Sequence, residues 1–318
     1  MEHNTVAVLG GSGFIGASVI NRLVSRGHNV KVATRRRAHA QHLLMLPVDI
    51  VETNIHDVDR LTSFIDGCDA VINLVGVLHD GTGDPYGPGF SVAHVELPQK
   101  LVLACRATGL RRVVQNSALR ADPDGPSMYL RSKGDGERVL REARELQTTI
   151  FRPSVVFGPG DRFLNTFADL QRIFPVIPLA CADAKFQPVF VGDVADAIVN
   201  SLDLDLALNN TYDVVGPRVY TLEELVHFAG LAIGRPRKIV RLSKALAHLQ
   251  ALTFEMLPGQ PPITRDNLAS MTLDSTSDVR LPPELGVQLT SLEAVATDYL
   301  RGSAQQARRD GYRASAHR

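Results

Sequence analysis

Apolar and β-branched residues occur in short runs along the first half of the chain, and between these runs apolar positions recur at helical spacing. Such alternation is typical of proteins in which helices join the parallel strands of a sheet. Gly67 and Gly109 each stand just before a run, where helices tend to end. We therefore predict an α/β fold with a doubly wound parallel sheet. The expected strands are residues 5–9, 29–34, 48–51, 70–74 and 112–115.

After the fifth run the pattern changes. Residues 148–161 predict one more strand and a turn, and beyond them the alternation loosens. We therefore expect a first domain over residues 1–155 and a smaller C-terminal α/β lobe over residues 156–302. Later strand-like runs, within about 186–217, are candidates for a return to the first domain: residues 187–194 and 210–217.

The composition indicates a globular protein with an ample core. Of 318 residues 44% are hydrophobic, and 34 basic side chains balance 34 acidic ones, which argues against nucleic-acid binding. Cys68, Cys105 and Cys181 lie far apart without CxxC spacing, so we expect no metal site and no disulfide framework. This cysteine usage fits a reducing cytosol.

The ends of the chain bear on its location. The first predicted strand begins at Thr5 without a charged leader, and no apolar stretch reaches about 18 residues, so we expect neither a signal peptide nor a membrane span. We predict a cytoplasmic protein, with the inner face of the membrane as the alternative location. Residues 303–318 are polar and rich in arginine, and we expect a disordered tail, with an anionic membrane or partner contact as the alternative.

A glycine-rich turn joins the first predicted strand to a helix. Its position between an apolar strand and a helix is the context of a Rossmann-type dinucleotide-binding turn. Glycine permits the tight turn and lets backbone N–H groups approach a pyrophosphate at the positive end of the helix. The predicted cofactor-binding residues here are Gly10, Gly11, Ser12, Gly13, Phe14, Ile15 and Gly16.

The end of the second predicted strand bears on the choice of dinucleotide. NAD-binding proteins usually carry Asp or Glu about 20 residues after the glycines, to bind the ribose 2′-hydroxyl. This chain has Thr34, Arg35, Arg36 and Arg37 there. Three cations at a helix start are unfavourable against the helix dipole, and the 2′-phosphate of NADP would offset them. We predict NADP(H), bound through Arg35, over NAD(H); for the other two arginines, pointing into water is the alternative.

A tyrosine and a lysine four residues apart suggest proton-transfer chemistry. Tyr129 and Lys133 would share one face of a helix, where the ammonium would favour the ionised phenol. Ser117 follows the fifth strand, at the sheet edge where ligands bind. We predict that Ser117 holds a substrate oxygen, Tyr129 passes the proton, and Lys133 tunes the phenol and binds the nicotinamide ribose. The alternative is a surface tyrosine with a solvated lysine.

Together these motifs resemble the extended short-chain dehydrogenase/reductase family, which includes NAD-dependent epimerases and dehydratases, over nearly the whole chain. His94 departs from the family, which often has Asn there. The resemblance implies further cofactor contacts, at Asn54 and Ile55 near the adenine, at Leu74, Val75 and Gly76, and at Pro153.

Three segments resemble one branch of that family more narrowly: residues 71–77, 127–137 and 257–267. This atypical branch includes the nucleotide-binding accessory subunit of respiratory complex I and its bacterial relatives. The resemblance implies NADP(H) binding, and for the respiratory subunit a structural role near the quinone region.

Two apolar stripes occur in the second lobe. Residues 163–174 carry the first; ordinary core is the leading interpretation, and a pocket for a quinone or isoprenoid the alternative. The second predicts a helix that covers the lobe, with a membrane or protein contact as the alternative, although the helix lacks a Lys/Arg-rich polar face. Its residues are Leu242, Leu246, Leu249, Thr253 and Met256.

Glycines recur in the segment 76–89 and predict a mobile loop that could close over substrate. His79 and Asp80 in this loop are candidate polar groups, with a solvated loop as the alternative.

These observations favour an NADP(H)-dependent oxidoreductase acting on a hydrophobic carbonyl or quinone-like substrate through Ser117, Tyr129 and Lys133. The alternative from another class is a non-catalytic NADPH-binding structural or assembly subunit of a respiratory or quinone-related complex, with a respiratory-complex or membrane-surface partner. A third reading is a nucleotide-sugar epimerase or dehydratase, against which the missing acid after the second strand argues. The family resemblance also makes a homodimer an option.

Overall fold

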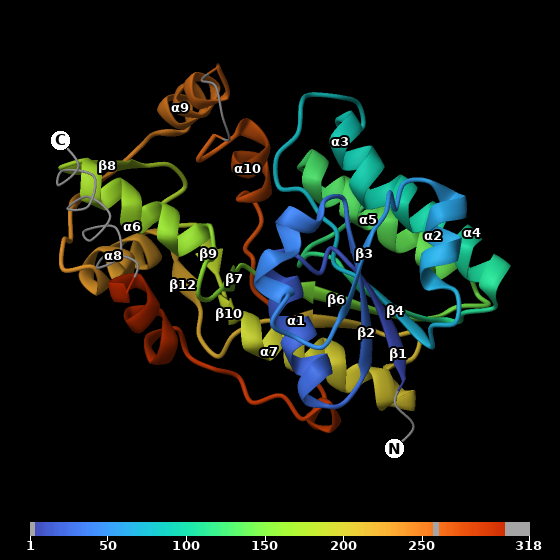
Figure 1. Ribbon diagram of the computed structural model, residues 1–318. Coiled ribbons are helices and arrows are strands. Elements are labelled where there is room, and N and C mark those ends of the chain that lie inside the picture. The colour runs from blue at the N-terminus through green and yellow to red at the C-terminus, as the bar shows by residue number, and fades with distance from the viewer. Residues whose placement is uncertain (1–3, 257–260, 303–318) are drawn as a thin grey trace, which may run out of the picture. The chain divides into compact units, whose positions relative to one another are not determined.

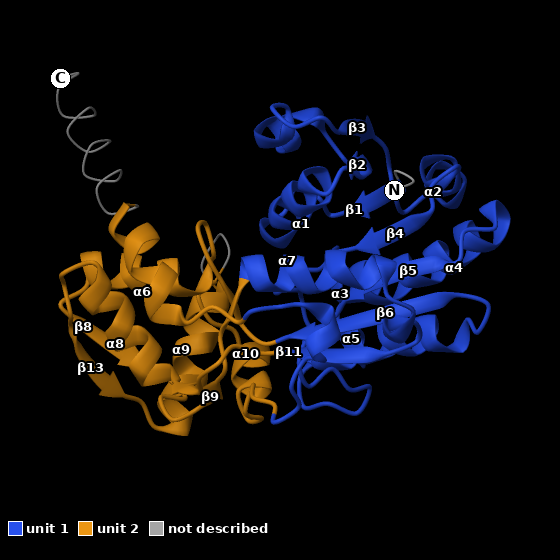
Figure 2. Cartoon of the chain, turned by 90° about the horizontal axis from the view of Figure 1, so that it is seen from below, with its two compact units in different colours: residues 1–153, 191–214, 278–288 blue, residues 154–190, 215–277, 289–318 orange. Residues whose placement is uncertain are grey.

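The computed structural model describes residues 4–256 and 261–302, whose elements are shown in Figure 1. The predicted tail at 303–318 lies outside the described residues. The chain divides into two compact units, coloured separately in Figure 2. Unit 1 contains residues 1–153, 191–214 and 278–288, and unit 2 contains residues 154–190, 215–277 and 289–318.

Unit 1 is built on one seven-stranded sheet. Its strands are β1 (Thr5–Leu9), β2 (Asn29–Thr34), β3 (Asp49–Glu52), β4 (Ala70–Asn73), β5 (Arg112–Asn116), β6 (Gln147–Pro153) and β11 (Thr211–Val214). They lie in the order β11-β6-β5-β4-β1-β2-β3, and every pair is parallel. The strand order reverses between β1 and β4, and ligands of open α/β sheets bind beyond the carboxyl ends at such a point.

Helices cover both faces of this sheet. The main ones are α1 (Phe14–Ser25), α2 (Val58–Ile65), α4 (Leu97–Thr108), α5 (Met128–Glu142) and α7 (Val191–Asn200). Successive strand residues point to opposite faces. On one face, Leu9 belongs to the core cluster that contains residues of α2, α4 and α5. On the other face, Val8 lies beside Ile20 of α1, and helix α1 packs against α7. The predicted doubly wound parallel sheet is confirmed.

Local signals set the helix ends of unit 1. Gly67 and Gly109 adopt the left-handed φ values of 69° and 75° where α2 and α4 end. Helix α5 begins after Ser127, whose hydroxyl accepts the Leu130 N–H over 3.1 Å. A π-helical turn, η2 (Ser91–Glu96), lies between the short α3 (Pro88–Phe90) and α4. The 3-10 helices of this unit are η1 (Arg37–Leu43), η3 (Ser201–Asp203), η4 (Asp205–Ala207) and η5 (Pro283–Leu285).

The two later strand-like runs have different outcomes. The run at 210–217 contains β11, which pairs with β6 in the sheet of unit 1. The run at 187–194 does not form one strand: β10 (Val189–Phe190) belongs to unit 2, and α7 begins at the next residue. Val191, Val194 and Ile198 recur at helical spacing and are all buried. A helix brings residues with this spacing to one face, whereas a strand would divide them between two faces. The strand prediction is therefore wrong from residue 191 onward.

Unit 2 combines short strand pairs with helices. The strands besides β10 are β7 (Val156–Phe157), β8 (Val176–Leu179), β9 (Lys185–Phe186), β12 (Tyr220–Thr221) and β13 (Lys238–Arg241). They pair as β10-β7, β12-β9 and β13-β8. The helices are α6 (Phe163–Ile173), α8 (Leu222–Ala232), α9 (Lys244–Met256) and α10 (Arg265–Ser270), and residues 292–302 are also helical.

The first apolar stripe of this unit is largely core. Leu164 and Ala168 are buried, and Phe163 and Phe167 pack against the same cluster. The stripe's end is different, because the side chain of Ile173 is 72% exposed.

The expectation that the second stripe covers the lobe is wrong for most of its residues, although Leu242 packs against a core cluster. In α9 the buried residues are Ala247 and Ala251, whereas Leu249 is 59% and Met256 80% exposed. The helix packs through its small residues, so its larger apolar side chains point away from the core. Within the described residues, no helix combines the length and apolar composition that a bilayer span needs.

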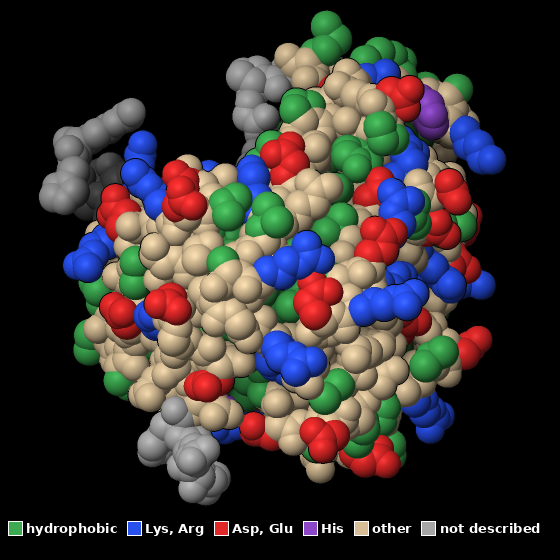
Figure 3. All heavy atoms as spheres, turned by 90° about the vertical axis from the view of Figure 1, so that its right-hand side faces the viewer, with side chains coloured by type: hydrophobic (Ala, Val, Ile, Leu, Met, Phe, Trp, Pro, Cys, Tyr) green, Lys and Arg blue, Asp and Glu red, His purple; other side chains and the backbone are tan. Residues whose placement is uncertain are grey.

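Charged side chains of both signs are mixed on the face of the molecule shown in Figure 3. This distribution accords with the balance of basic and acidic residues in the sequence. It gives that face no single-sign field that would steer a strongly charged partner.

Candidate nucleotide-binding and catalytic site

The glycine-rich turn lies at the carboxyl end of β1. Gly10 has a φ of +77°, and a Cβ atom there would lie 3.0 Å from the backbone of Leu74. A Cβ atom on Gly16 would come within 2.5 Å of the carbonyl oxygens of Gly10 and Gly11. Among the described residues, no side chain caps the N-terminus of α1. The free N–H groups and the close-packed glycines therefore fit a dinucleotide pyrophosphate.

The other predicted residues of this turn lie around it. Gly11 is buried beside Ile20, whereas Gly13 is exposed and precedes α1. Ser12, Phe14 and Ile15 are half-buried.

The arginines after β2 have an acidic neighbour that sequence spacing did not reveal. Glu52 pairs with Thr34 across β3 and β2, and its carboxylate accepts the Arg37 N–H over 3.1 Å. This carboxylate offsets part of the positive charge at the start of η1. Arg35 and Arg36 are exposed beside it.

The segment after β3 forms a compact turn. The Asn54 side chain accepts the His56 N–H over 3.1 Å, and Ile55 packs against the core of unit 1. Burial lowers the pKa of His56, with smaller contributions from nearby charges that include Arg35. Arg35 therefore lies near the predicted adenine-binding segment.

The segment after β4 touches both the glycine turn and α5. The Leu74 N–H donates to the Leu9 carbonyl over 2.9 Å, and the Val75 N–H donates to the Asn73 side chain over 3.1 Å. A Cβ atom on Gly76 would lie 3.1 Å from Nζ of Lys133. The structure thus brings the predicted cofactor segment 74–76 next to the predicted catalytic lysine.

Ser117 follows β5 and is buried. Its Oγ has no hydrogen-bond partner among the described residues, and neither does Oδ1 of the adjacent Asn116. The backbone of Ser117 is fixed, because its N–H donates to the Phe151 carbonyl over 2.7 Å. Pro153 ends β6 nearby and accepts the Leu119 N–H over 2.9 Å. On this fixed backbone, the Ser117 hydroxyl can donate to a ligand oxygen, and the Asn116 oxygen can accept from a ligand N–H or O–H.

Tyr129 and Lys133 lie on one face of α5, as their spacing predicted. Nζ of Lys133 is 6.0 Å from the centre of the Tyr129 ring and 3.4 Å from the carbonyl oxygen of Asn116. This last contact links α5 to the segment that carries Ser117.

The expected effect of Lys133 on the Tyr129 phenol is wrong for this structure. Burial raises the pKa of Tyr129 to about 12 and lowers the pKa of Lys133 to about 8. Desolvation disfavours the charged forms of both groups and is the leading cause of both shifts. At neutral pH the phenol therefore keeps its proton and can donate it.

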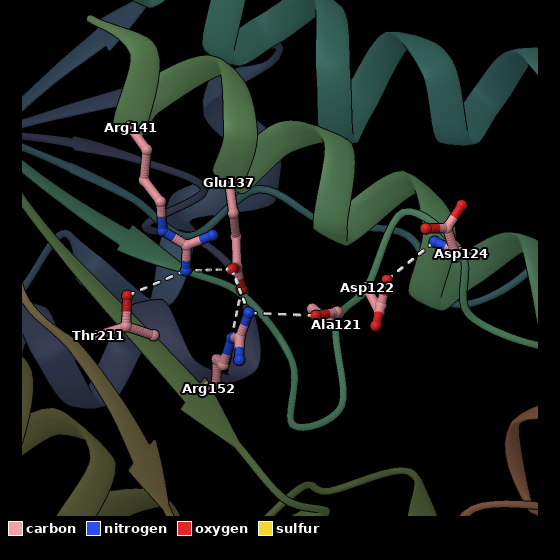
Figure 4. A network of polar contacts seen from close by, with 7 residues as sticks. All are labelled: Ala121, Asp122, Asp124, Glu137, Arg141, Arg152 and Thr211. Atoms are coloured by element: carbon pink, nitrogen blue, oxygen red, sulfur yellow. Dashed lines mark hydrogen bonds and ion pairs between the residues drawn. The ribbon is translucent and has the colours of Figure 1, made fainter. Parts of the chain in front are cut away.

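Glu137, one turn beyond Lys133, anchors α5 (Figure 4). Its carboxylate is buried and accepts from Arg152 over 2.6 and 2.8 Å and from Arg141 over 2.7 Å. Arg152 also donates to the carbonyl of Ala121 over 3.1 Å, which holds the loop between Ser117 and α5. A cavity of about 420 Å³ lies beside this network, but none of Ser117, Tyr129 and Lys133 lines it.

The loop expected to be mobile is tied to α5 in this structure. The Tyr86 hydroxyl donates to Asp135 over 3.0 Å, and Arg131 donates to the carbonyl of Pro85. Asp80 accepts the N–H groups of Gly81 and Phe90, a local role typical of a turn.

Sequence reasoning missed several polar residues of this region. Asn116 could have been found as the neighbour of Ser117, and His94 was visible only as a departure from the family pattern. The Glu137–Arg152 pair joins positions 15 residues apart and had no local signal.

Comparisons with known proteins identify the family of the chain. A family model described as the NAD dependent epimerase/dehydratase family matches residues 6–214. The mitochondrial NADH dehydrogenase [ubiquinone] 1 alpha subcomplex subunit 9 of Mus musculus is 30% identical over 303 residues, which cover 92% of this chain and 79% of that protein.

Two further similarities are to reductases. A ceramide reductase of Caulobacter vibrioides is 26% identical, with 74% of this chain and 73% of that protein covered. An NADPH-dependent quinone oxidoreductase of Escherichia coli, solved with NADPH, has a TM-score of 0.72 at 17% identity and covers 95% of this chain and 99% of that one, which shows a shared fold. The match over residues 6–214, together with the 30% identity to the mouse subunit, shows that this chain belongs to the NAD-dependent epimerase/dehydratase family.

Proposed function

We propose that this protein is an NADP(H)-dependent reductase of a hydrophobic carbonyl or quinone-like substrate. The observation that carries the proposal is the hydroxyl of Ser117, which is buried and has no hydrogen-bond partner among the described residues. The residue before it, Asn116, accepts a hydrogen bond from Lys133 through its backbone carbonyl. A buried donor without a partner is costly, and a substrate oxygen would satisfy it.

Each residue of the set has one task. Ser117 donates a hydrogen bond to the substrate oxygen, and Tyr129 delivers a proton to it. Since burial raises the pKa of Tyr129 to about 12, the phenol is protonated at neutral pH and can act as the acid in a reduction. Lys133 stays charged below its pKa of about 8 and stabilises negative charge that develops beside it. The nicotinamide, when bound, supplies the hydride.

The preference for NADP(H) rests on Arg35 and Arg36. They are exposed after β2, which itself ends without an acidic residue, the neighbouring Glu52 being on β3, and Arg35 lies near the predicted adenine segment. Arg35→Ala should weaken NADPH binding roughly tenfold and leave NADH binding unchanged, because only NADPH carries the 2′-phosphate. Arg26→Ala, at the opposite end of α1, is the matched control. Equal affinity of the wild type for both dinucleotides would refute the preference.

The hydrophobic substrate class is supported by a sequence relative whose name specifies ceramide. The test uses the absence of tryptophan, which leaves nicotinamide fluorescence uncluttered. NADPH-loaded protein is mixed with quinones, aldehydes and ketones, and loss of fluorescence is followed. Tyr129→Phe should slow turnover by about 10²–10⁴-fold, whereas Tyr212→Phe on β11 should not. Equal rates in wild type and Tyr129→Phe would refute the mechanism.

A second candidate is a structural or assembly subunit that binds NADPH without consuming it. The 30% identity to a complex I subunit over 92% of the chain favours it. It predicts co-purification with respiratory subunits at the inner face of the membrane and an assembly whose activity is unaffected by Tyr129→Phe. NADPH that survives the whole substrate panel would shift the assignment to this function. The sugar-nucleotide reading gains less support, because the structural neighbours that bind such substrates share only the fold.

A further inference from the structure

His94 lies between the segment after β4 and helix α5, and the proposed chemistry does not use it. The side chain is 3% exposed and sits in the π-helical turn η2. Turns of this kind are rare and frequently occur at functional sites.

Hydrogen bonds on both sides define the protonation of this ring. The Val77 N–H donates to Nε2 over 3.1 Å, so Nε2 carries no proton. Nδ1 lies 2.8 Å from Oγ of Ser132, whose own proton is donated to the Tyr129 carbonyl over 2.8 Å. Nδ1 must therefore be the donor to Ser132, and His94 is the neutral Nδ1–H tautomer. The donors of these three hydrogen bonds therefore all point the same way, from the Val77 N–H through His94 and Ser132 to the Tyr129 carbonyl.

The surroundings keep the ring in place and uncharged. Phe90 stacks on it with ring centres 5.5 Å apart, and Tyr129 meets it edge-on at 5.7 Å. A Cβ atom on Gly76 would lie 3.5 Å from Nε2 of His94 and 3.1 Å from Nζ of Lys133. Burial, with the Lys133 charge as the smaller cause, lowers the pKa of His94 to about 2. Protonation would add a cation beside Lys133 and break the bond from Val77.

We propose that His94 is a positioning residue, which sets the placement of the predicted cofactor segment 74–76 and the adjoining Val77 relative to the helix of Tyr129 and Lys133, and which does not transfer a proton. Its two nitrogens serve two segments: Nε2 holds the segment after β4, and Nδ1 holds α5 through Ser132. The catalytic part of this inference rests on the function proposed above, whereas the structural part concerns the chain alone.

Three substitutions separate the two bonds. The amide of His94→Gln can reach the place of Nε2 and accept from Val77, but it does not replace the donor to Ser132. The shorter His94→Asn reaches the place of Nδ1 and leaves Val77 unpartnered. His94→Phe keeps a ring between Phe90 and Tyr129 and removes both bonds. The same three changes at His227, exposed on α8, are the matched controls.

The variants should differ in which property they lose. His94→Asn should weaken NADPH binding roughly tenfold at unchanged turnover under saturation, because the unpaired Val77 N–H loosens the cofactor segment. His94→Gln should keep the NADPH affinity and lose turnover roughly tenfold, because α5 loses its link. His94→Phe should lose both. His94→Phe with wild-type affinity and turnover would overturn the proposal.

Two measurements on the cofactor-free protein keep the proposal independent of the proposed reaction. Hydrogen exchange over residues 74–78 should speed up in His94→Asn and His94→Phe but not in His94→Gln. The ¹⁵N signals of the wild-type imidazole should show one neutral Nδ1–H form from about pH 5 to about pH 9. A ring that titrates in this range, or exchange that is equal in all variants, would overturn the positioning role. Failure of the wild type to bind NADPH would instead refute the proposed function and leave these two results standing.

Discussion

Helices α5 and α9 depart from ordinary burial in opposite directions. The more polar of the two, α5, buries Ser132, Lys133 and Glu137. The apolar α9 buries only small residues and exposes its leucines. Buried polar groups and exposed apolar groups are the informative exceptions in a folded protein.

The two helices differ in whether the cost of their unusual burial is offset by specific contacts. Each buried polar group of α5 has a partner: Ser132 bonds to the Tyr129 carbonyl, Lys133 to the Asn116 carbonyl, and Glu137 to Arg152. The partners of Lys133 and Glu137 lie outside the helix and fix α5 relative to the sheet edge, which the proposed catalytic role of this helix requires. The exposed leucines of α9 have no comparable compensation within the described residues, so they do not define a site.

The largest effect should come from Glu137. Glu137→Ala leaves Arg152 without its carboxylate in a partly buried position, and the free energy of unfolding should fall by about 4 kcal/mol. Chemical denaturation measures it. Glu142→Ala, exposed on the same helix, should change stability by less than about 0.5 kcal/mol. Equal losses at the two positions would mean that the buried network does not anchor α5.

Lys133 should give stability a dependence on pH. Its pKa is about 8 in the folded protein against 10.5 for a solvated lysine side chain, so the unfolded chain binds more protons between these values. The free energy of unfolding should therefore rise by about 2 kcal/mol from about pH 7 to about pH 10, relative to Lys133→Met. Denaturation of both proteins across this range tests the sign. A falling difference would show that Lys133 is not desolvated.

The smallest effects should come from α9. Ala251→Leu forces a larger side chain into a buried position and should lower the free energy of unfolding by about 1.5 kcal/mol. Leu249→Ser, on the exposed face, should change it by less than about 0.5 kcal/mol. Thermal unfolding of the two variants compares them. A large loss in Leu249→Ser would show that the leucine face is covered in solution.

Local sequence carried much of the first unit. Residues 5–9 and 29–34 form the strands that their composition predicted, and Gly67 and Gly109 end helices as expected. Strands of this kind are short, nearly continuous apolar runs, and glycine marks left-handed turns, so both features can be read from a few neighbouring residues. Unit 2 offered less, because four of its strands have two residues and give no periodic signal.

The candidate site was predicted in part. The spacing of Tyr129 and Lys133 was enough to place both on one face of a helix, and the position of Ser117 after β5 was enough to place it at the sheet edge. Glu52 and His94 could not be assigned in this way, because their partners come from other strands and helices.

Sequence alone therefore determined the parallel sheet, the glycine turn and the chemical identity of the proposed catalytic residues, since these depend on local composition and spacing. Tertiary packing determined the raised pKa of Tyr129, the single protonation state of His94 and the exposed face of α9. Desolvation, hydrogen-bond direction and burial depend on atoms that distant parts of the chain bring together, and no local pattern contains that information.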